Sequence, residues 1–346
     1  MEKVLSIVVP SYNSEKWLGS CLDSLLIGLD DKIEVIVVND GSKDETSKIA
    51  HEYASKHSFI SVIDKENGGH GSGINAGLKI AKGLYFKVLD SDDHLDKDGL
   101  YKVIETIERH QKEGNLPDFY LTDYKSVSTY DGKEFLHSMK QRFSRVNEVV
   151  GWDGFEKLKT EEYFMIHQSF VRTEMLKETK MNLIEKTFYE DNQFMYHVLI
   201  HAKSMCYIDT AVYLYSMGRD EQSVSVKNMA KNCAHQMRVF RACIDMCSYE
   251  DMMKMEKAHK DNVLHEFFSL NVLTYFYTYI DGNREKVKQF KEVNKYFKQK
   301  DKKLYNKIRW RTPIFWTRLI PPITPLRKLA CRLGYKYEGK KIGWRV

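Results

Sequence analysis

Acidic and small polar residues follow several apolar runs in the first hundred residues. Asp90-Ser91-Asp92-Asp93 follows the apolar residues 85–89, and residues 10–13 and 39–42 follow two earlier apolar runs. Side chains at the carboxyl ends of parallel strands converge on one crevice, where an open α/β sheet binds its ligand. Such a crevice suits a hard divalent cation that carries a phosphorylated substrate.

The spacing of the acids suggests different tasks for them. Alternate residues of an extended backbone face the same side, so Asp90 and Asp92 are expected to project together. We expect Asp92 to hold Mn²⁺ or Mg²⁺, and Asp90 to be a second metal-site residue that reaches a ribose or a metal-bound water. Asp93 and Asp96 are expected to be solvated or to cap a helix at Lys97. The alternative is that all these acids merely solvate a loop.

Strand-like and helix-like patterns alternate over the first hundred residues, which favours βαβ units and a parallel sheet. Helical spacing is found at residues 17–26 and 100–107, and Ser42 with Glu45 predicts a capping box at the start of another helix. The apolar, β-branched runs that predict strands are Leu5–Pro10, Glu34–Asn39, Ile60–Ile63 and Tyr85–Leu89.

The rest of the chain is less regular. Residues 118–126 and 206–215 are predicted strands, residues 189–201 a helix, and residues 129–147 a hairpin or loop. We predict a catalytic domain over residues 1–226, with a nucleotide-binding half at 1–110 and an acceptor half at 111–226. A helical region at 227–300 and a basic, aromatic segment at 301–346 follow.

Composition restricts the class of protein. The 346 residues are 42% hydrophobic, which favours a folded protein over a disordered one. Six cysteines without a C-x-x-C pair favour a reduced, cytosolic protein without a zinc site. Neither a signal-peptide pattern nor a run of about 18 apolar residues occurs, so we expect a protein that is neither secreted nor integral to a membrane.

Charge is distributed unevenly along the chain. Residues 284–346 contain 20 Lys/Arg and 4 Asp/Glu, a net charge of +16, which leaves −10 for residues 1–283. Trp310, Phe315, Trp316 and Trp344 lie among these basic residues, which four prolines interrupt. We expect the residues from about Lys302 onward to hold the enzyme at the cytoplasmic face of an anionic membrane. Packing on the acidic body and nucleic-acid binding are the alternatives, the latter disfavoured because no nucleic-acid-binding motif is recognised.

Five motifs in order resemble the family 2 inverting glycosyltransferases of the GT-A fold, of the type that builds bacterial cell-surface polysaccharides. The resemblance is dense over residues 4–110 and looser at Tyr189-Glu190-Asp191 and residues 213–225. The motifs are Val8-Val9-Pro10-Ser11-Tyr12-Asn13, Val38-Asn39-Asp40-Gly41-Ser42-Lys43-Asp44-Glu45-Thr46, Glu66-Asn67-Gly68-Gly69, Asn75-Ala76-Gly77-Leu78 and Leu89-Asp90-Ser91-Asp92-Asp93.

The resemblance implies an α/β fold of the GT-A type, Rossmann-like with a mostly parallel sheet, and a helical C-terminal extension. Asp191 corresponds to the family's catalytic base, with its neighbour Glu190 orienting a loop or the acceptor; the two roles are exchangeable, and Asp191 could instead cap a helix. Asp40 is expected to accept a hydrogen bond from the base of the nucleotide. Ile74 stands where the family often has arginine. The nucleotide-sugar pocket is expected to comprise Pro10, Ser11, Tyr12, Asn13, Asp40, Asn67, Gly71, Asp90, Ser91 and Arg219.

These expectations define an inverting, metal-assisted glycosyltransferase. It moves a sugar from a nucleotide-diphosphate sugar, with uracil the favoured base, to a hydroxyl of a glycan or a polyprenyl-linked acceptor. The alternatives are a catalytically silent protein that binds sugar nucleotides, and a nucleotidyltransferase. His70 and His167 carry less weight, because a lone histidine is more often structural.

Overall fold

The structure is a computed structural model that describes residues 3–128, 130–159, 162–217, 226–309, 319–321 and 325–341. The chain divides into two compact units. The sheet unit comprises residues 1–156, 165–186 and 201–220, and the helical unit comprises residues 157–164, 187–200 and 221–346. The consecutive domain boundaries expected at residues 110, 226 and 300 stay predictions.

The first four strands of the sheet unit form its parallel half. They are β1 (Leu5–Ser11), β2 (Ile33–Asn39), β3 (Ile60–Asp64) and β4 (Tyr85–Val88). Their order is β3-β2-β1-β4, and every neighbouring pair is parallel. All four lie where the sequence predicts them. Because β1 is central, both its faces are buried, and an unbroken apolar run is the pattern expected for such a strand.

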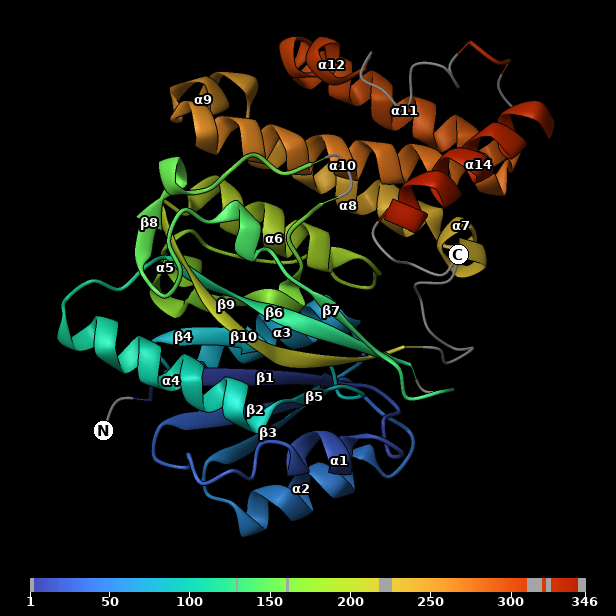
Figure 1. The fold of residues 1–346 in the computed structure, drawn as a ribbon. Coiled ribbons are helices and arrows are strands. Elements are labelled where there is room, and N and C mark those ends of the chain that lie inside the picture. The colour runs from blue at the N-terminus through green and yellow to red at the C-terminus, as the bar shows by residue number, and fades with distance from the viewer. Residues whose placement is uncertain are drawn as a thin grey trace. The chain divides into compact units, whose positions relative to one another are not determined.

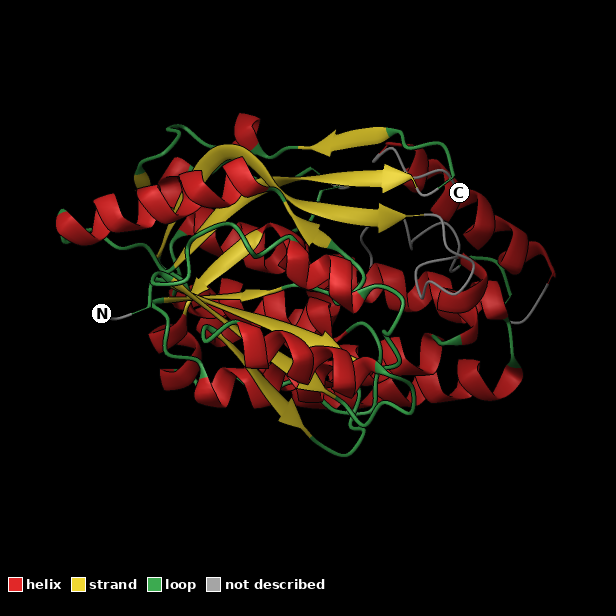
Figure 2. Cartoon of the chain, turned by 90° about the horizontal axis from the view of Figure 1, so that it is seen from below, coloured by secondary structure: helices red, strands yellow, loops and turns green. Residues whose placement is uncertain are grey.

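The remaining strands extend this sheet in mixed orientation (Figure 2). They are β5 (His94–Leu95), β6 (Phe119–Ser128), β7 (Glu134–His137), β8 (Val149–Gly151), β9 (Ser169–Arg172) and β10 (Ser204–Met217). β9 is antiparallel to both β4 and β6, whereas β10 is parallel to β6. β6 and β7 form the hairpin that was one of two predictions for residues 129–147. The α/β class is confirmed.

Helices cover both faces of the sheet (Figure 1). Ile7 and Val9 of β1 share one apolar core with residues of three of these helices, whereas Val8 lies against Gly77 of α3 on the opposite face. This alternation follows from the period of two along a strand. The helices are α1 (Leu18–Asp23), α2 (Thr46–Lys56) and α4 (Lys97–Lys112) in the first layer, α3 (His70–Ile80) on the other face, and α5 (Thr173–Glu178) next to β9.

Helix starts confirm one sequence prediction and correct another. Asp96 caps α4, because its Oδ1 accepts a hydrogen bond from the amide of Gly99 at 2.8 Å. The capping box predicted for Ser42 and Glu45 is wrong. α2 begins at Thr46, and Asp44 accepts from the amide and the hydroxyl of that residue. A capping carboxylate one residue before Glu45 therefore starts this helix.

The helical unit consists of helices packed around α10 (Figure 1). Aromatic residues of three of its helices, Phe240, Phe267 and Phe297, pack ring against ring. The helices are α6 (Glu190–His201), α7 (Val226–Lys231), α8 (Cys233–Met246), α9 (Tyr249–Lys254), α10 (Lys257–Asp281), α11 (Arg284–Lys300), α12 (Lys302–Ile308) and α14 (Pro325–Lys341). The helical prediction for residues 227–299 is confirmed. No helix among the described residues is long and apolar enough to cross a membrane.

Candidate active site

The acidic motif forms a tight turn directly after β4. The amide of Asp93 donates to the carbonyl of Asp90 at 3.0 Å, so residues 90–93 close a turn instead of continuing the strand. The expectation of an extended backbone at Asp90-Ser91-Asp92 is therefore wrong. Asp90 and Asp92 are half-buried, whereas Asp93 is fully buried. The turn thus presents two partly accessible carboxylates above a buried one.

Two histidines flank Asp90. Nε2 of His70, the first residue of α3, lies 3.0 Å from Oδ1 of Asp90, and Nε2 of His167 lies 3.4 Å from Oδ2. His167 belongs to a short 3-10 helix, η3 (Ile166–Gln168). Burial alone would raise the pKa of Asp90, but hydrogen bonds from His167 and His70 outweigh it and hold the pKa well below its ordinary value. Asp90 is therefore a carboxylate at neutral pH.

Asp93 has both carboxylate oxygens engaged by β10. The hydroxyl of Tyr213 donates to Oδ2 at 2.8 Å, and the amide of Ser216 donates to Oδ1 at 2.7 Å. Burial, followed by the nearby charges of Asp90 and Asp92, raises the pKa of Asp93 well above its usual value. The expectation that Asp93 is solvated or caps a helix is therefore wrong. It anchors the acidic turn to β10.

A buried lysine holds the segment that carries His167. Lys87 of β4 is fully buried, and its ammonium donates to the carbonyls of Ile166, His167 and Ser169. It also lies 4.9 Å from the ring centroid of Tyr213. Burial lowers the pKa of Lys87 to about 7, against the opposing effect of Asp90. Lys87 therefore fixes the backbone of η3 next to the acidic turn.

The donor atoms around the turn suit a divalent cation. One ligand atom each of Asp90, Asp93 and His167 lies within 4.8 Å of the others. His167 is buried, and its Nδ1 has no hydrogen-bond partner in the part of the chain that the structure describes. Carboxylate oxygens with one imidazole form a donor set that Mn²⁺ accepts. Of the two metal-site residues predicted from the sequence, this group contains Asp90 but not Asp92, and it adds His167 as a candidate ligand. The role of Asp92 stays a prediction.

The loop after β1 is joined to the loop after β2. The amide of Asn13 donates to Oγ of Ser42 at 3.0 Å, and Oδ1 of Asn13 accepts from the amide of Lys43 at 2.9 Å. Asn13 has φ 50°, a region that asparagine tolerates better than most residues. Tyr12 is 49% exposed, so its ring is available for stacking. Pro10 and Ser11, which precede this loop, are buried in β1.

Asp40 organises the glycine turn before α3. Its carboxylate accepts from the amides of Gly68 and Gly69 at 2.9 and 2.7 Å, and it forms an ion pair with Lys65 at 2.7 Å. The side-chain amide of Asn67 donates to the backbone carbonyl of Asp40 at 3.0 Å. Asp40 is 2% exposed, so the carboxylate expected to meet a nucleotide base also orders this turn. Its recognition of the base stays a prediction.

The start of α3 combines several predicted residues. Gly71 lies in the first turn of the helix, and Gly69 before it has φ 86°. A helix amino terminus favours phosphate, because its first amides are unpaired and its dipole is positive. Ser91 of the acidic turn has a different contact, because its hydroxyl lies 2.7 Å from that of Ser14, which follows β1.

Asn75 of the fourth motif has a structural contact. Its side chain donates to the carbonyl and accepts from the amide of Leu183, at 2.9 and 2.8 Å. Further on, the amide of Lys186 donates to the carbonyl of Gly68 at 2.5 Å. Ile74, where the family often has arginine, is fully buried. This motif therefore fixes residues 183–186, which lead towards the second acidic pair.

The second acidic pair opens α6 in the helical unit. Glu190 is buried and Asp191 is half-buried, with Asn192 donating to Oδ1 of Asp191 at 3.0 Å. Asp191 lies inside the first turn of α6, so it does not occupy the capping position. The residue before the pair, Tyr189, has φ 70°, a conformation that is strained for a bulky side chain. Strain of this kind persists only where the surroundings impose it.

Glu266 of α10 is a buried acid that interacts electrostatically with Asp191. It is 2% exposed, and its Oε2 has no hydrogen-bond partner among the described residues. Burial raises the pKa of Glu266 to about 8, with an opposing hydrogen bond from the amide of Phe164 and a further increase from the charge of Asp191. At neutral pH Glu266 is therefore largely protonated, which avoids a second negative charge beside Asp191.

The structure brings together only some of the site residues that the sequence predicts. The sheet unit gathers the predicted residues of the motifs at the carboxyl ends of β1, β2 and β4, whereas Glu190 and Asp191 belong to the helical unit. Arg219 lies outside the described residues. His70 and His167 received little weight as predicted site residues, and Lys87 and Glu266 were not predicted. A lysine in the middle of an apolar strand was the available signal for Lys87.

A family profile and several relatives match the part of the chain that carries the motifs. The profile of "Glycosyl transferase family 2" matches residues 6–174. Glycosyltransferase GlyG of Streptococcus pneumoniae is 26% identical over 221 residues, covering 62% of this chain and 71% of that protein. The uncharacterized glycosyltransferase EpsJ of Bacillus subtilis is 40% identical over 111 residues, covering 32% of each.

A poly(ribitol-phosphate) β-N-acetylglucosaminyltransferase, TarS of Staphylococcus aureus, is 26% identical over 268 residues, 76% of this chain and 43% of that protein. The chain thus spans between about a third and seven-tenths of the length of these three relatives. The crystal structure of TarS residues 1–349 with UDP-GlcNAc superposes with a TM-score of 0.65 at 22% identity, covering 99% of this chain and 92% of that one. This likeness confirms the GT-A type of fold. Residues 6–174 of the chain are therefore a domain of glycosyl transferase family 2.

Proposed function

We propose that this protein transfers a sugar from a nucleotide-diphosphate sugar, with a UDP-sugar as the favoured donor, to an acceptor hydroxyl with inversion of configuration. The observation that carries the proposal is the acidic turn after β4, where Asp90 is ionised and flanked by His70 and His167. It lies in a family 2 domain, at the sheet edge where such folds bind ligands.

The donor site is proposed to use the loops that follow β1 and β2. Tyr12 offers an exposed ring, Asp40 a carboxylate, and the start of α3 at His70 offers helix amides for a diphosphate. A relative with the same type of fold has been crystallised with UDP-GlcNAc, which supports a UDP-sugar without identifying the sugar.

Asp92 and Asp90 are proposed to hold Mn²⁺ or Mg²⁺, with His167 as a further ligand. When bound, the cation neutralises negative charge that develops on the diphosphate leaving group. The protein contributes the geometry, because Lys87 fixes η3 and Asp93 fixes the acidic turn to β10. Both anchors are buried, so they restrict motion of the carboxylates that face the donor.

Asp191 is proposed to be the general base that accepts the proton of the attacking hydroxyl. Inversion at the anomeric carbon is a direct displacement, which requires a base at the acceptor. Asp191 is partly accessible, whereas Glu190 is buried, so Asp191 is better suited to meet an acceptor. Glu190 is the alternative base, and otherwise orients the surrounding backbone.

The acceptor is proposed to be a glycan or a polyprenyl-linked glycan, met in the cytoplasm at the inner membrane face. The charge of +16 over residues 284–346 supports attraction to an anionic surface. Trp310, Phe315, Trp316 and Trp344, proposed to enter the lipid interface, lie outside the described residues. Nucleic acid is not proposed as a partner.

A thermal-shift screen tests the proposed function. The full chain is heated with a panel of nucleotide sugars, in Mn²⁺ and in EDTA, because a ligand that binds the folded state raises the unfolding midpoint. We expect a rise with at least one UDP-sugar, larger in Mn²⁺ than in EDTA. Subsequent release of UDP distinguishes a transferase from the alternative, a silent binding protein. A panel without any midpoint shift contradicts the proposal.

A further inference from the structure

Helix α11 borders two pockets of the helical unit that the proposed transfer reaction does not use. Residues of α8 and α11 line a pocket of about 580 Å³. Residues of α10, α11, α12 and α14 line another of about 360 Å³. The α11 residues of the two pockets occupy different faces of the helix, as its period of 3.6 residues requires. The two pockets differ in the charges of the residues that line them.

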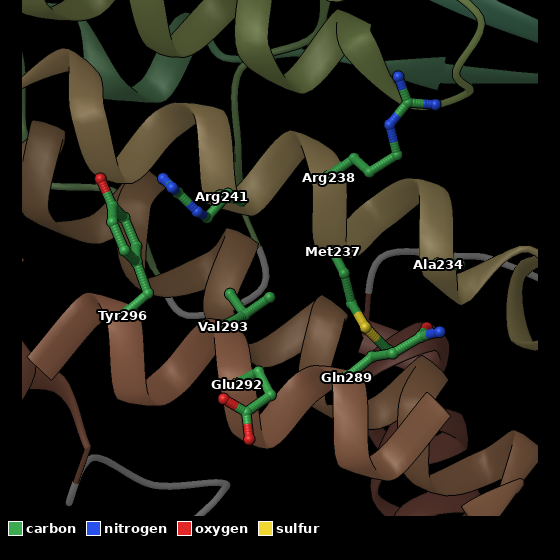
Figure 3. Close-up of a pocket in the computed structure, with 8 residues that line it drawn as sticks. All are labelled: Ala234, Met237, Arg238, Arg241, Gln289, Glu292, Val293 and Tyr296. Atoms are coloured by element: carbon green, nitrogen blue, oxygen red, sulfur yellow. The ribbon is translucent and has the colours of Figure 1, made fainter. Parts of the chain in front are cut away.

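The cationic groups of the larger pocket already have counterparts. Figure 3 shows Arg241 against the ring of Tyr296, and its guanidinium carbon lies 3.1 Å from the ring centroid. The same guanidinium forms an ion pair with Asp245 at 2.7 Å. Glu292 adds a negative charge to the lining. An anion would therefore have to displace existing partners to bind there.

The smaller pocket, which we call the α11–α14 pocket, is basic. Lys291, Lys295 and Lys298 of α11 line it together with Arg327 of α14, and no acidic residue belongs to its lining. The three lysines are exposed, and none forms an ion pair with a residue that the structure describes. Arg327 is 5% exposed and lies 4.5 Å from the ring centroid of Tyr279. The pocket is thus lined by one buried cation and three exposed cations.

This arrangement favours a multivalent anion. The lysines are spaced at i, i+4 and i+7, so their ammonium groups share one helix face and repel one another. An anion that bridges them removes this repulsion, and lysine is a common point-charge ligand of phosphate. Asn294, also in the lining, supplies a neutral donor. The volume of about 360 Å³ is at the lower end of the range for small-molecule sites.

We propose that the α11–α14 pocket binds a phosphate-bearing group. The ligand would be a phosphate or diphosphate ester, either on a soluble phosphorylated molecule or in a lipid headgroup. The proposal is independent of the transfer reaction, since all the residues that carry it belong to helices α10 to α14.

Calorimetry with inorganic pyrophosphate tests the pocket directly. The full chain carrying Asp92→Ala is titrated at low salt in EDTA, which removes the cation on which the proposed donor site depends. We expect binding that weakens by at least about tenfold when Lys291, Lys295 and Lys298 are all changed to glutamine, because three charges are lost. A matched control changes the exposed Lys56, Lys79 and Lys112 of the sheet unit to glutamine and keeps affinity within about twofold.

Vesicle binding then distinguishes a lipid headgroup from a soluble phosphate ester as the source of the phosphate. Loss of binding to phosphatidylglycerol vesicles in the pocket variant, but not in the control, assigns the site to a lipid headgroup. Unchanged vesicle binding with lost pyrophosphate binding assigns it to a soluble phosphate ester. Absence of pyrophosphate binding by the parent, or equal weakening in the two triple variants, overturns the proposal. Neither result depends on whether the protein transfers sugar.

Discussion

Asp90 illustrates how much of a residue's chemistry depends on distant parts of the chain. Two further acids, Asp92 and Asp93, follow it closely in the sequence. Its ionised state is nevertheless maintained by His70, 20 positions earlier, and by His167, which lies after β6 in the chain. Asp93, only three residues further on, has its pKa raised by burial. The two carboxylates thus differ because Asp90 accepts hydrogen bonds from two imidazoles, whereas burial and the charges of Asp90 and Asp92 dominate at Asp93.

Substitution of Asp191 separates binding from chemistry. Asp191→Asn preserves the shape of the side chain and removes its capacity to accept a proton, so donor affinity stays within about twofold and kcat falls by about a hundredfold or more. Calorimetry with the donor and a transfer assay give the two values. Glu190→Gln is the matched comparison, with a smaller loss of kcat. A larger loss in Glu190→Gln would exchange the two roles.

Glu266 makes stability depend on pH. Burial raises its folded pKa to about 8, above the value of about 4.3 for an exposed glutamate. Between these values the folded protein retains a proton that the unfolded chain releases, so this glutamate's contribution to stability declines as pH rises, with a slope of at most about 1.4 kcal/mol per pH unit. Glu266→Gln lacks this titration.

Urea unfolding of both proteins from pH 5 to pH 9 measures the effect. The variant should gain stability relative to the parent as pH rises, and Glu292→Gln at the exposed surface of α11 controls for the loss of one charge. A constant difference between parent and Glu266→Gln over this range would show that Glu266 is already ionised in the folded protein.

At the scale of elements, local patterns predicted the parallel half of the sheet well. β1, β2, β3 and β4 lie within one or two residues of their predicted bounds, because buried strands between turn residues give a strong local signal. The antiparallel partners of β4 and β6 could not be predicted, since β9 is four residues long and its pairing is decided by tertiary contacts.

The candidate site, like the sheet, could be predicted only where local sequence patterns determine it. The acids at the end of β4 follow from strand order and motif, whereas His167 and Lys87 are brought there by η3 and by buried carbonyl groups. The short turn at residues 90–93 replaced the predicted extended backbone, because Asp93 is drawn towards β10 by Tyr213 and Ser216. Contacts between residues this far apart in the sequence produce no periodic pattern, so they could not be predicted from it.

The contact between α3 and β1 requires glycine. A Cβ at Gly77 would lie 2.4 Å from Cγ1 of Val8, so Gly77→Ala forces the helix away from the sheet. We expect a loss of roughly 1–3 kcal/mol from overpacking. Gly19→Ala in α1 is the control, because its nearest atom would be Oη of Tyr53 at 3.6 Å, and the better helix propensity of alanine then favours folding. Equal urea midpoints for the two variants would contradict close packing at Gly77.

At the scale of the whole molecule, the uneven charge predicts salt-dependent membrane binding. Sedimentation with phosphatidylglycerol vesicles should fall as ionic strength rises, because attraction to the surface is screened within roughly 8 Å at physiological salt. Truncation after Asp301 should remove most of the binding, and neutral vesicles serve as the control. Equal sedimentation with neutral and anionic vesicles would favour a basic segment that packs against acidic protein surface instead.

The most direct test of the proposed transferase activity is the release of UDP from a UDP-sugar by the full chain in Mn²⁺. The proposed site predicts turnover by the parent protein, and a loss of about a hundredfold or more in Asp92→Ala and in EDTA, because the charge on the diphosphate is then uncompensated. An unchanged unfolding midpoint of the variant shows that the fold is intact. Turnover that persists undiminished in both EDTA and Asp92→Ala, or tight donor binding without any turnover by the parent, would contradict a metal-assisted glycosyltransferase.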